Sequence, residues 1–240
     1  PNSELQPTSL PECLYGTSTL FQTADTVAEK YGISREDCDA FGLASQKKAI
    51  EAIDGGRFKD EIVPVYIPRR KQDPLCFDTD EYPRRDTSAE KMAKLRPIFE
   101  GGVTTAGNAS GRNDGAAALL LMSGERAAEL GVKPLVTIIG AAAAGVDPKY
   151  MGTGPIDATR KLMARMEKEN GLTLDDFGLV EINEAFAAQS LACVKELELN
   201  PDIVNVNGGA IALGHPLGCP GGEEVCTRFW RGRAGKRKEG

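Results

Sequence analysis

The single histidine of this chain lies in a glycine-rich segment, where an imidazole is a candidate for catalysis. His215 is the only histidine among 240 residues, and it stands in NVNGGAIALGHPLG, which runs from Asn205 to Gly218. Glycines allow a backbone to approach a ligand closely and to adopt φ values that other residues avoid. Two alternatives to a functional role stay open. The glycines could only form a tight turn, and His215 could be a partly buried side chain whose hydrogen bonds are made within the fold.

A second polar segment follows another predicted strand. The sequence VEIN ends in Asn183, and Glu184 is expected to open the next helix. Because ligands of open α/β sheets bind beyond the carboxyl ends of the strands, we expect Asn183 and His215 to lie in one region. A nucleotide loop is disfavoured, since no Gly-Lys-Ser/Thr follows the glycines and no G-x-G-x-x-G opens a helix.

Composition excludes several classes of protein. The net charge of -6 argues against a general nucleic-acid binder. No run approaches the roughly 18 apolar residues that a membrane helix needs, and no signal peptide is evident. The six cysteines form no C-x-x-C pair, and with one histidine a zinc or other metal site is not expected. Reduced thiols favour the cytoplasm, with an organelle matrix as the alternative.

The elements that must position these residues alternate between helix and strand. The pattern predicts two helices over 23–56, the second with a capping box formed by Ser34 and Asp37, a strand at 61–67 and an exposed excursion at 68–96. Further elements are predicted as a buried strand or helix at 115–123, a buried strand within 133–145, strands at 177–183 and 202–207, and helices at 124–131, 152–171 and 184–199. This alternation predicts a mostly parallel sheet covered on both faces.

Three segments resemble signatures of the thiolase family, which comprises acetyl-CoA acetyltransferases and 3-ketoacyl-CoA thiolases. VEINEAFAAQ and NVNGGAIALGHPLG resemble its asparagine and histidine signatures, and TAGNASGRNDGAAALLLMS is similar to a third. VAEKYGISREDCDAF, GRFKDEIVPV and AKLRPIF resemble segments of its loop domain, in order. The resemblance covers roughly residues 22–218.

The resemblance implies an α/β, layered αβαβα fold of two similar halves with an inserted loop domain, incomplete in this chain. On that map, residues 1–105 are the loop domain and the coenzyme A-binding excursion. Residues 106–145 end the amino-terminal half, 146–218 begin the carboxy-terminal half, and 219–240 form an atypical basic tail that is expected to be disordered. Complete members are homodimers or homotetramers.

The same resemblance assigns catalytic roles. A cysteine nucleophile accepts the acyl group, and a second cysteine moves a proton on the acetyl α-carbon. The role of the histidine, which activates the nucleophile and helps to hold the thioester oxygen, falls on His215. The role of the asparagine, which fixes a water of the oxyanion hole, falls on Asn183.

Residues expected to contact the coenzyme A thioester are also implied by the resemblance. They are Ser110 at the pantetheine arm, Ala185, Phe186, Phe99 and Ala106 along the tunnel, and Arg84 near the adenine. Plain core packing is the alternative for the apolar members, and an N-cap or turn for Ser110. Arg85 is the alternative to Arg84.

Both ends depart from the family pattern. The nucleophile is expected upstream of Pro1, so none of the six cysteines takes that role, and TLFQTAD replaces a His-Met-Gly stretch by the substrate. The second cysteine belongs to a Cys-x-Gly loop that is missing here. Cys219-Pro220-Gly221 has the form Cys-x-Gly, but it follows His215 too closely to be that loop. Cys219 is expected to be a packing residue.

The expected activity is that of an acetyl-CoA C-acetyltransferase, which joins two acetyl-CoA into acetoacetyl-CoA reversibly, with coenzyme A thioesters as substrates and no cofactor. The isolated chain is expected to be inactive and to fold poorly or aggregate. The alternatives are a 3-ketoacyl-CoA thiolase of fatty acid β-oxidation, a ketosynthase, which the single histidine disfavours, and a non-catalytic protein that binds acyl-CoA or a partner subunit. Binding to nucleic acid or membrane is not expected.

Overall fold

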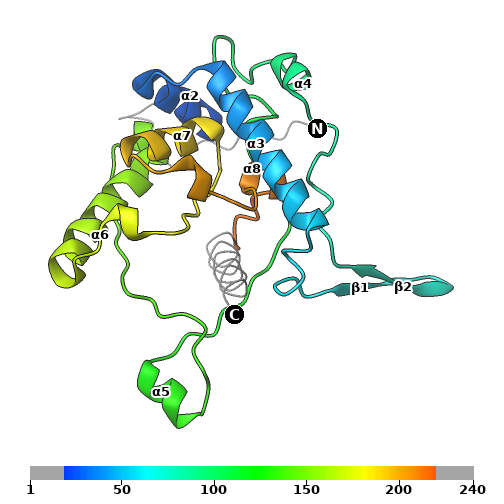
Figure 1. The fold of residues 1–240 in the computed structure, drawn as a ribbon. Coiled ribbons are helices and arrows are strands. Elements are labelled where there is room, and N and C mark those ends of the chain that lie inside the picture. The colour runs from blue at the N-terminus through cyan, green and yellow to red at the C-terminus, as the bar shows by residue number, and fades with distance from the viewer. Residues whose placement is uncertain (1–18, 220–240) are drawn as a thin grey trace.

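A cluster of helices forms the body of the protein. The structure, a computed structural model, describes residues 19–219. The helices that pack against one another are α2 (Leu20–Tyr31), α3 (Arg35–Asp54), α7 (Ala187–Glu196) and α8 (Ala210–Leu213) (Figure 1). Their buried faces meet in a core that includes Val27, Cys38, Ala188 and Ile211. Small residues dominate this core, so the helix backbones lie close together.

The helix α6 (Gly154–Asn170) extends this body through a second, smaller core of Ile156, Cys193 and Leu197. Short helices complete the connections: α4 (Ala89–Ala93) and the 3-10 turns η1 (Pro148–Thr153), η2 (Leu174–Asp176) and η3 (Pro201–Ile203).

Local signals place the helix ends, as the sequence predicts. Ser34 caps α3 by accepting from the Asp37 N–H, and the Asp37 carboxylate accepts from the Ser34 N–H at 3.1 Å, which confirms the capping box. Pro155 lies in the first turn of α6, and Gly171 follows that helix in the left-handed conformation. The helices predicted over 23–56 are α2 and α3.

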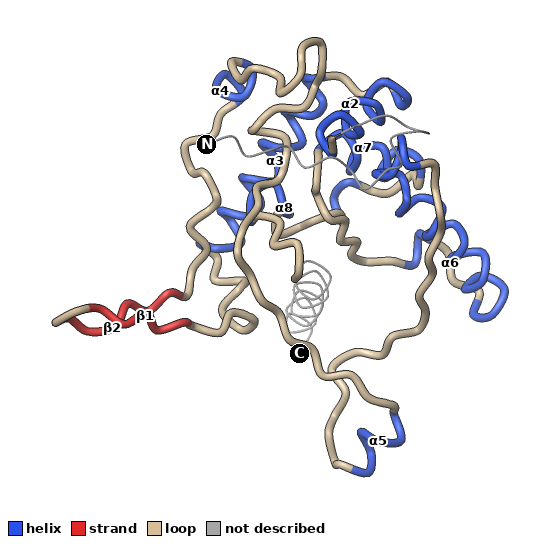
Figure 2. Tube along the Cα trace, turned by 180° about the vertical axis from the view of Figure 1, so that it is seen from behind, coloured by secondary structure: helices blue, strands red, loops and turns tan. Residues whose placement is uncertain are grey.

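A β-hairpin projects from the body within the predicted excursion. It pairs β1 (Val65–Arg69) with β2 (Gln72–Phe77) in antiparallel register, and both strands are exposed throughout. Figure 2 shows these two strands, in red, standing away from the helices. The prediction of a strand at 61–67 was wrong at its start, because residues 58–62 continue in turns that bring the Ile62 N–H to the Phe58 carbonyl.

Within residues 19–219 the predicted parallel sheet is reduced to isolated parallel bridges, one of which joins two of the predicted strands. Val180 and Val204, from the strands predicted at 177–183 and 202–207, form an isolated parallel bridge. The Val180 N–H donates to the Ile203 carbonyl, and the Asn205 N–H donates to the Val180 carbonyl. The two segments therefore run side by side, and the ends that follow the bridge lead into Asn183 and into the glycine loop.

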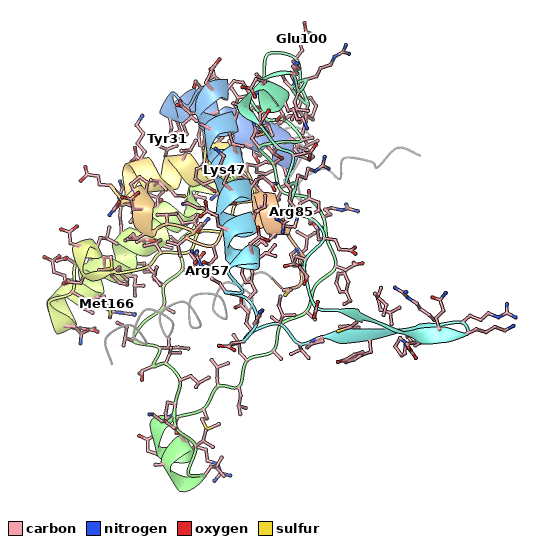
Figure 3. All side chains as sticks on the ribbon, turned by 45° about the vertical axis from the view of Figure 1, so that its right-hand side comes forward. Tyr31, Lys47, Arg57, Arg85, Glu100 and Met166 are labelled. Carbon is pink, nitrogen blue, oxygen red and sulfur yellow. The ribbon has the colours of Figure 1, made fainter. Side chains whose placement is uncertain are left out.

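The prediction that 115–123 and 133–145 are buried elements was wrong for the residues that the structure describes. Both segments are extended and mostly exposed, and the only helix between them is α5 (Gly124–Glu129). Figures 1 and 3 show most of this stretch leaving the body, and at Gly140 it lies against the side chains of Leu162 and Arg165 on α6. A strand needs hydrogen-bonding neighbours to become buried. Within residues 19–219 no strand pairs with these segments, and the side chains of Lys161 and Arg165 on α6 donate to two of their carbonyls, at Ala143 and Ala141.

Several expectations fall outside the described residues, namely those on Cys13, Cys226 and most of the tail predicted at 219–240. Within residues 19–219, no helix is long and apolar enough to cross a membrane.

The exposed apolar stretch from 115 to 139 predicts self-association. Leu120 is 84% exposed and Ile138 66%, and an unpaired apolar strand is a template for pairing with another chain. We expect the purified chain to form larger species as its concentration rises, and the double variant Leu120→Lys, Ile138→Lys to form fewer, with the same helix content. Analytical ultracentrifugation and far-UV circular dichroism measure both. A chain that stays monomeric and melts cooperatively at every concentration would contradict this prediction.

Candidate functional site

His215 and Asn183 meet at the end of the glycine loop. His215 follows α8 and Gly214, whose φ of 101° is in the region that favours glycine. The His215 N–H donates to the Gly111 carbonyl at 3.0 Å, which fixes the backbone on which the imidazole stands. The Asn183 Nδ2 then lies 3.4 Å from the His215 Nε2, a long hydrogen bond. The two residues that the sequence singles out are thus neighbours in space.

The surroundings of the imidazole favour its neutral form. Burial lowers the pKa of His215 below its usual range. Since an amide nitrogen only donates, the His215 Nε2 accepts in the contact with Asn183, and in the neutral ring the proton sits on Nδ1. Nδ1 is buried and has no hydrogen-bond partner among residues 19–219. The site therefore holds a proton acceptor that is free of charge near neutral pH.

Glu184 does not open the next helix, which corrects the prediction. α7 begins three residues later, at Ala187. Ala109 and Phe186 form an antiparallel bridge and the Ala187 N–H donates to the Asn108 carbonyl, so 184–186 stay extended. The Glu184 side chain is 1% exposed. Burial raises the pKa of its carboxyl, and hydrogen bonds from Asn205 and Ser45 oppose that rise.

Three donors from separate segments meet the Glu184 carboxyl. Oε2 accepts from the Ser45 hydroxyl at 2.6 Å and from the Ile211 N–H at 3.2 Å. Oε1 accepts from the Asn205 amide at 2.8 Å. Ser45 belongs to α3, and Ile211 belongs to α8. Sequence reasoning missed Ser45 and Asn205 and placed Glu184 at a helix start. A serine on a helix that is otherwise packed against the core could have pointed to a buried partner.

Asn205 anchors the segment 182–186, here called the Asn183 loop, because its side chain forms the two hydrogen bonds that a neighbouring strand backbone would form. Its φ of 44° turns the chain away from the parallel bridge. Its side chain then accepts from the Ile182 N–H and donates to the Ile182 carbonyl, both at 2.8 Å. The residue before Asn183 is therefore fixed on both of its polar backbone groups.

The glycines at 208 and 209 provide room for the protein's own atoms. A Cβ at Gly208, whose φ is 80°, would lie 2.7 Å from the Ser45 carbonyl oxygen, and a Cβ at Gly209 would collide with the Glu184 carboxyl. Close packing on α3 and Glu184 explains both glycines. At these two positions the lack of a side chain therefore serves the packing of the loop itself, and this favours a structural reason for the two glycines over close approach to a ligand.

Ala185 and Phe186 belong to the Asn183 loop, and Ser110 lies next to it. The Ser110 N–H and hydroxyl both donate to the Ala185 carbonyl at 3.0 Å. The Phe186 ring packs edge-to-face on Phe21, with ring centres 5.5 Å apart. The segment around Ser110 and the segment around Asn183 therefore form one surface.

Phe99, Ala106 and Arg84 lie on loops that precede Ser110 in the chain. Phe99 is half-buried, Ala106 is exposed, and the Arg84 backbone N–H donates to Gln46. No hydrogen bond among residues 19–219 joins these three to His215 or Asn183. The Arg85 guanidinium forms two hydrogen bonds with Asp54 at the end of α3, at 2.7 and 2.9 Å (Figure 3). Of the two arginines, Arg84 is the one not committed to this ion pair.

Among residues 19–219 no disulfide forms at any of the four cysteines, which are Cys38, Cys76, Cys193 and Cys219. Burial raises the pKa of Cys38 to about 12 and that of Cys193 to about 11, so neither provides a thiolate at neutral pH. Among residues 19–219, no group of three or more histidine, cysteine, aspartate and glutamate side chains could hold a metal ion.

Comparison with known proteins defines the class. The sequence-family model of the thiolase N-terminal domain matches residues 2–125, and the family model of the thiolase C-terminal domain matches residues 132–235. The chain belongs to the thiolase family. It is 56% identical over 206 residues to an acetyl-CoA acetyltransferase of Chromobacterium violaceum, covering 85% of this chain and 52% of that protein. A Pseudomonas aeruginosa acetyl-CoA acetyltransferase is also 56% identical, with 85% and 51% covered. The chain spans about half the length of these curated relatives.

Solved structures of similar proteins support the same family. A crystal structure of the Bacillus anthracis acetyl-CoA acetyltransferase superposes with a TM-score of 0.87 at 45% identity, covering 96% of this chain and 56% of that one. Human mitochondrial 3-ketoacyl-CoA thiolase gives a TM-score of 0.81 at 39% identity, with 92% and 54% covered. The fold is therefore α/β and thiolase-like, and this chain contains part of it.

Burial of His215 predicts its titration. We expect the pKa of His215 to be lower in the folded chain than in urea, where it should be about 6.5. Because the folded value is the lower one, the contribution of His215 to stability is present above the unfolded pKa and is lost as the pH falls through the folded pKa. NMR of the ¹³C-labelled histidine measures both midpoints without overlap, since the chain has one histidine. A folded midpoint equal to or above the unfolded one would contradict this.

The packing of Gly209 against Glu184 predicts a steric cost. Gly209→Ala should lower the free energy of unfolding by about 1–3 kcal/mol. Gly154→Ala is the matched control, because a Cβ there meets nothing within 4 Å, and it should change stability by no more than about 0.5 kcal/mol. Urea unfolding compares the two. Equal effects would show that the Gly209 contact is unimportant.

Proposed function

We propose that this chain supplies the histidine–asparagine part of a thiolase active site, and that the complete protein is an acetyl-CoA C-acetyltransferase. Such an enzyme joins two acetyl-CoA into acetoacetyl-CoA and free coenzyme A, or reverses this by thiolysis. The observation that carries the proposal is the 3.4 Å contact between Asn183 and His215. The family membership and the names of the relatives support the choice of reaction.

In this proposal a neutral imidazole does two things. It accepts the proton of a cysteine thiol and so raises the thiolate fraction. Burial, which lowers the pKa of His215, keeps the ring in the neutral form that can accept this proton. When the thiolate attacks the thioester, negative charge develops on the carbonyl oxygen, and the resulting imidazolium together with a water fixed by Asn183 stabilises that charge. When the adduct collapses, the bond between the acyl carbon and the coenzyme A sulfur breaks and the acyl group stays on the cysteine sulfur. The imidazolium gives its proton to the leaving sulfur, so that coenzyme A leaves as the thiol and the imidazole is neutral again.

The cysteines of the reaction are not assigned within this chain. Cys38 and Cys193 are unsuited by their raised pKa values. Cys219 is proposed as a packing residue.

The substrate surface is proposed to contain Ser110, Ala185 and Phe186 beside the pantetheine arm, with Phe99, Ala106 and Arg84 farther along the coenzyme. The hydrogen bond from Ser110 to Ala185 and the bridge between Phe186 and Ala109 support the first group. The coenzyme A thioester is the substrate, with no further cofactor proposed.

The remaining proposals concern organisation. Residues 1–105 would form the loop domain, 106–145 the end of the amino-terminal half, and 146–218 the start of the carboxy-terminal half. The complete protein would be a homodimer or homotetramer. Cysteines without a disulfide among residues 19–219 suit the cytoplasm or an organelle matrix. The similarity to human mitochondrial 3-ketoacyl-CoA thiolase supports a second candidate, cleavage of longer 3-ketoacyl-CoA.

Calorimetric binding and thiolysis of acetoacetyl-CoA test the proposal on the 240-residue chain and on His215→Ala and Asn183→Ala. We expect measurable binding, weakened in both variants, without turnover. Absence of binding would overturn the acyl-CoA site, and binding unchanged by both variants would favour a non-catalytic binding protein. Turnover that requires His215 and is lost in Cys219→Ala would overturn the packing role of Cys219 and assign it as the nucleophile.

A further inference from the structure

The buried Glu184 carboxyl joins the two loops of the site to one helix. It follows Asn183 directly in the chain, and it accepts from Ile211, four residues before His215. The carboxyl also accepts from the Ser45 hydroxyl, and Ser45 belongs to α3, a helix of 20 residues. Ser45 also accepts from the Gly209 N–H at 3.1 Å, so the same hydroxyl holds both the carboxyl and the glycine loop.

The donors around Glu184 require an acceptor at both oxygens. The Ile211 N–H cannot reverse its direction, because it belongs to the backbone. The Asn205 amide cannot reverse either, since its oxygen accepts from the Ile182 N–H and its nitrogen donates to the Ile182 carbonyl. A carboxylate satisfies both sides, whereas a glutamine would turn an NH₂ group against one fixed donor.

A nearby positive charge matches this carboxylate. Lys48 follows Ser45 by one turn of α3, and its Nζ donates to the Val204 carbonyl at 2.9 Å, beside Asn205. Burial raises the pKa of Glu184, and the charge of Lys48 acts against that rise together with the hydrogen bonds from Asn205, Ser45 and Ile211. α3 therefore contributes a hydroxyl donor to the carboxyl and a positive charge in its surroundings.

We propose that Glu184 is a positioning residue that sets the separation of Asn183 and His215 by holding both loops against α3. Glu184 touches neither reacting group. Its consequence for acyl transfer rests on the function proposed above, whereas its effect on the geometry of His215 does not.

The sole histidine provides a direct readout of this role. The full chain, labelled with ¹³C and ¹⁵N at histidine, is titrated by NMR as the native sequence, as Glu184→Gln and as Ser45→Ala. Asp25→Asn is the matched control, because Asp25 also anchors a loop by accepting three hydrogen bonds, from Val103 and Thr104, and does not bond to the His215 or Asn183 loops. Thermal unfolding is recorded for each variant.

We expect Glu184→Gln to raise the His215 midpoint toward about 6.5, the value of an unperturbed histidine, and to shift the ring ¹⁵N signals toward a mixture of tautomers. Ser45→Ala should produce a smaller shift in the same direction. Asp25→Asn should lower the melting temperature and leave the His215 signals in place.

An unchanged His215 midpoint and tautomer in folded Glu184→Gln would overturn the proposal. If Glu184→Gln does not fold, an unchanged midpoint in Ser45→Ala would overturn it, as would an equal shift in Asp25→Asn, which would show that general loosening moves His215. Because no substrate is present, a failure of acyl-CoA binding in the assay above combined with a response of His215 would reject the proposed function and retain the positioning role.

Discussion

A carboxylate that is removed from water must be met by donors, because an unpaired buried charge costs several kcal/mol in stability. Glu184 meets this condition with three donors from α3, α8 and the turn at Asn205. Ser45 lies far from Asn205 and Ile211 in the sequence, and Glu184 belongs to a third segment, so their meeting fixes the relative places of three segments at once. The missing side chain at Gly209 gives the carboxyl its space, and the missing side chain at Gly208 lets the loop lie on α3. The contact between Asn183 and His215 is built on this arrangement.

Features determined by nearby residues could be predicted from the sequence. The capping box of Ser34 and the left-handed Gly171 depend on a few neighbouring positions, and the structure shows both. The meeting of Asn183 with His215 was predictable because Asn183 and the loop that carries His215 each follow a strand-like segment, and parallel neighbours end at the same edge. Glu184 was assigned to the start of a helix by local spacing. The backbone of Asn108 and Ala109, more than seventy residues earlier, decides its real conformation, and no local pattern contains that contact.

The apolar runs at 115–123 and 133–145 show the opposite limit. Their composition correctly indicates segments suited to burial, but burial is a property of the neighbours that a segment finds. Among residues 19–219 these runs have no paired strand, and they lie open to solvent (Figure 1). The composition of a segment indicates that its apolar side chains would be stabilised by burial in a sheet. Whether that burial occurs depends on strands from the rest of the fold that pair with it.

The pairing of the Asn205 side chain with Ile182 extends a β-ladder after the backbone has turned away. A side chain reaches only a fixed distance, so this pairing sets where the chain must be when it leaves the bridge between Val180 and Val204. Ile211 and His215 are then tied to Glu184 and Gly111 within a few residues. The loop from 205 to 215 is therefore under a constraint on length that is separate from any constraint on composition: a side chain can be exchanged where its contacts permit, whereas one inserted residue would put every later contact out of register.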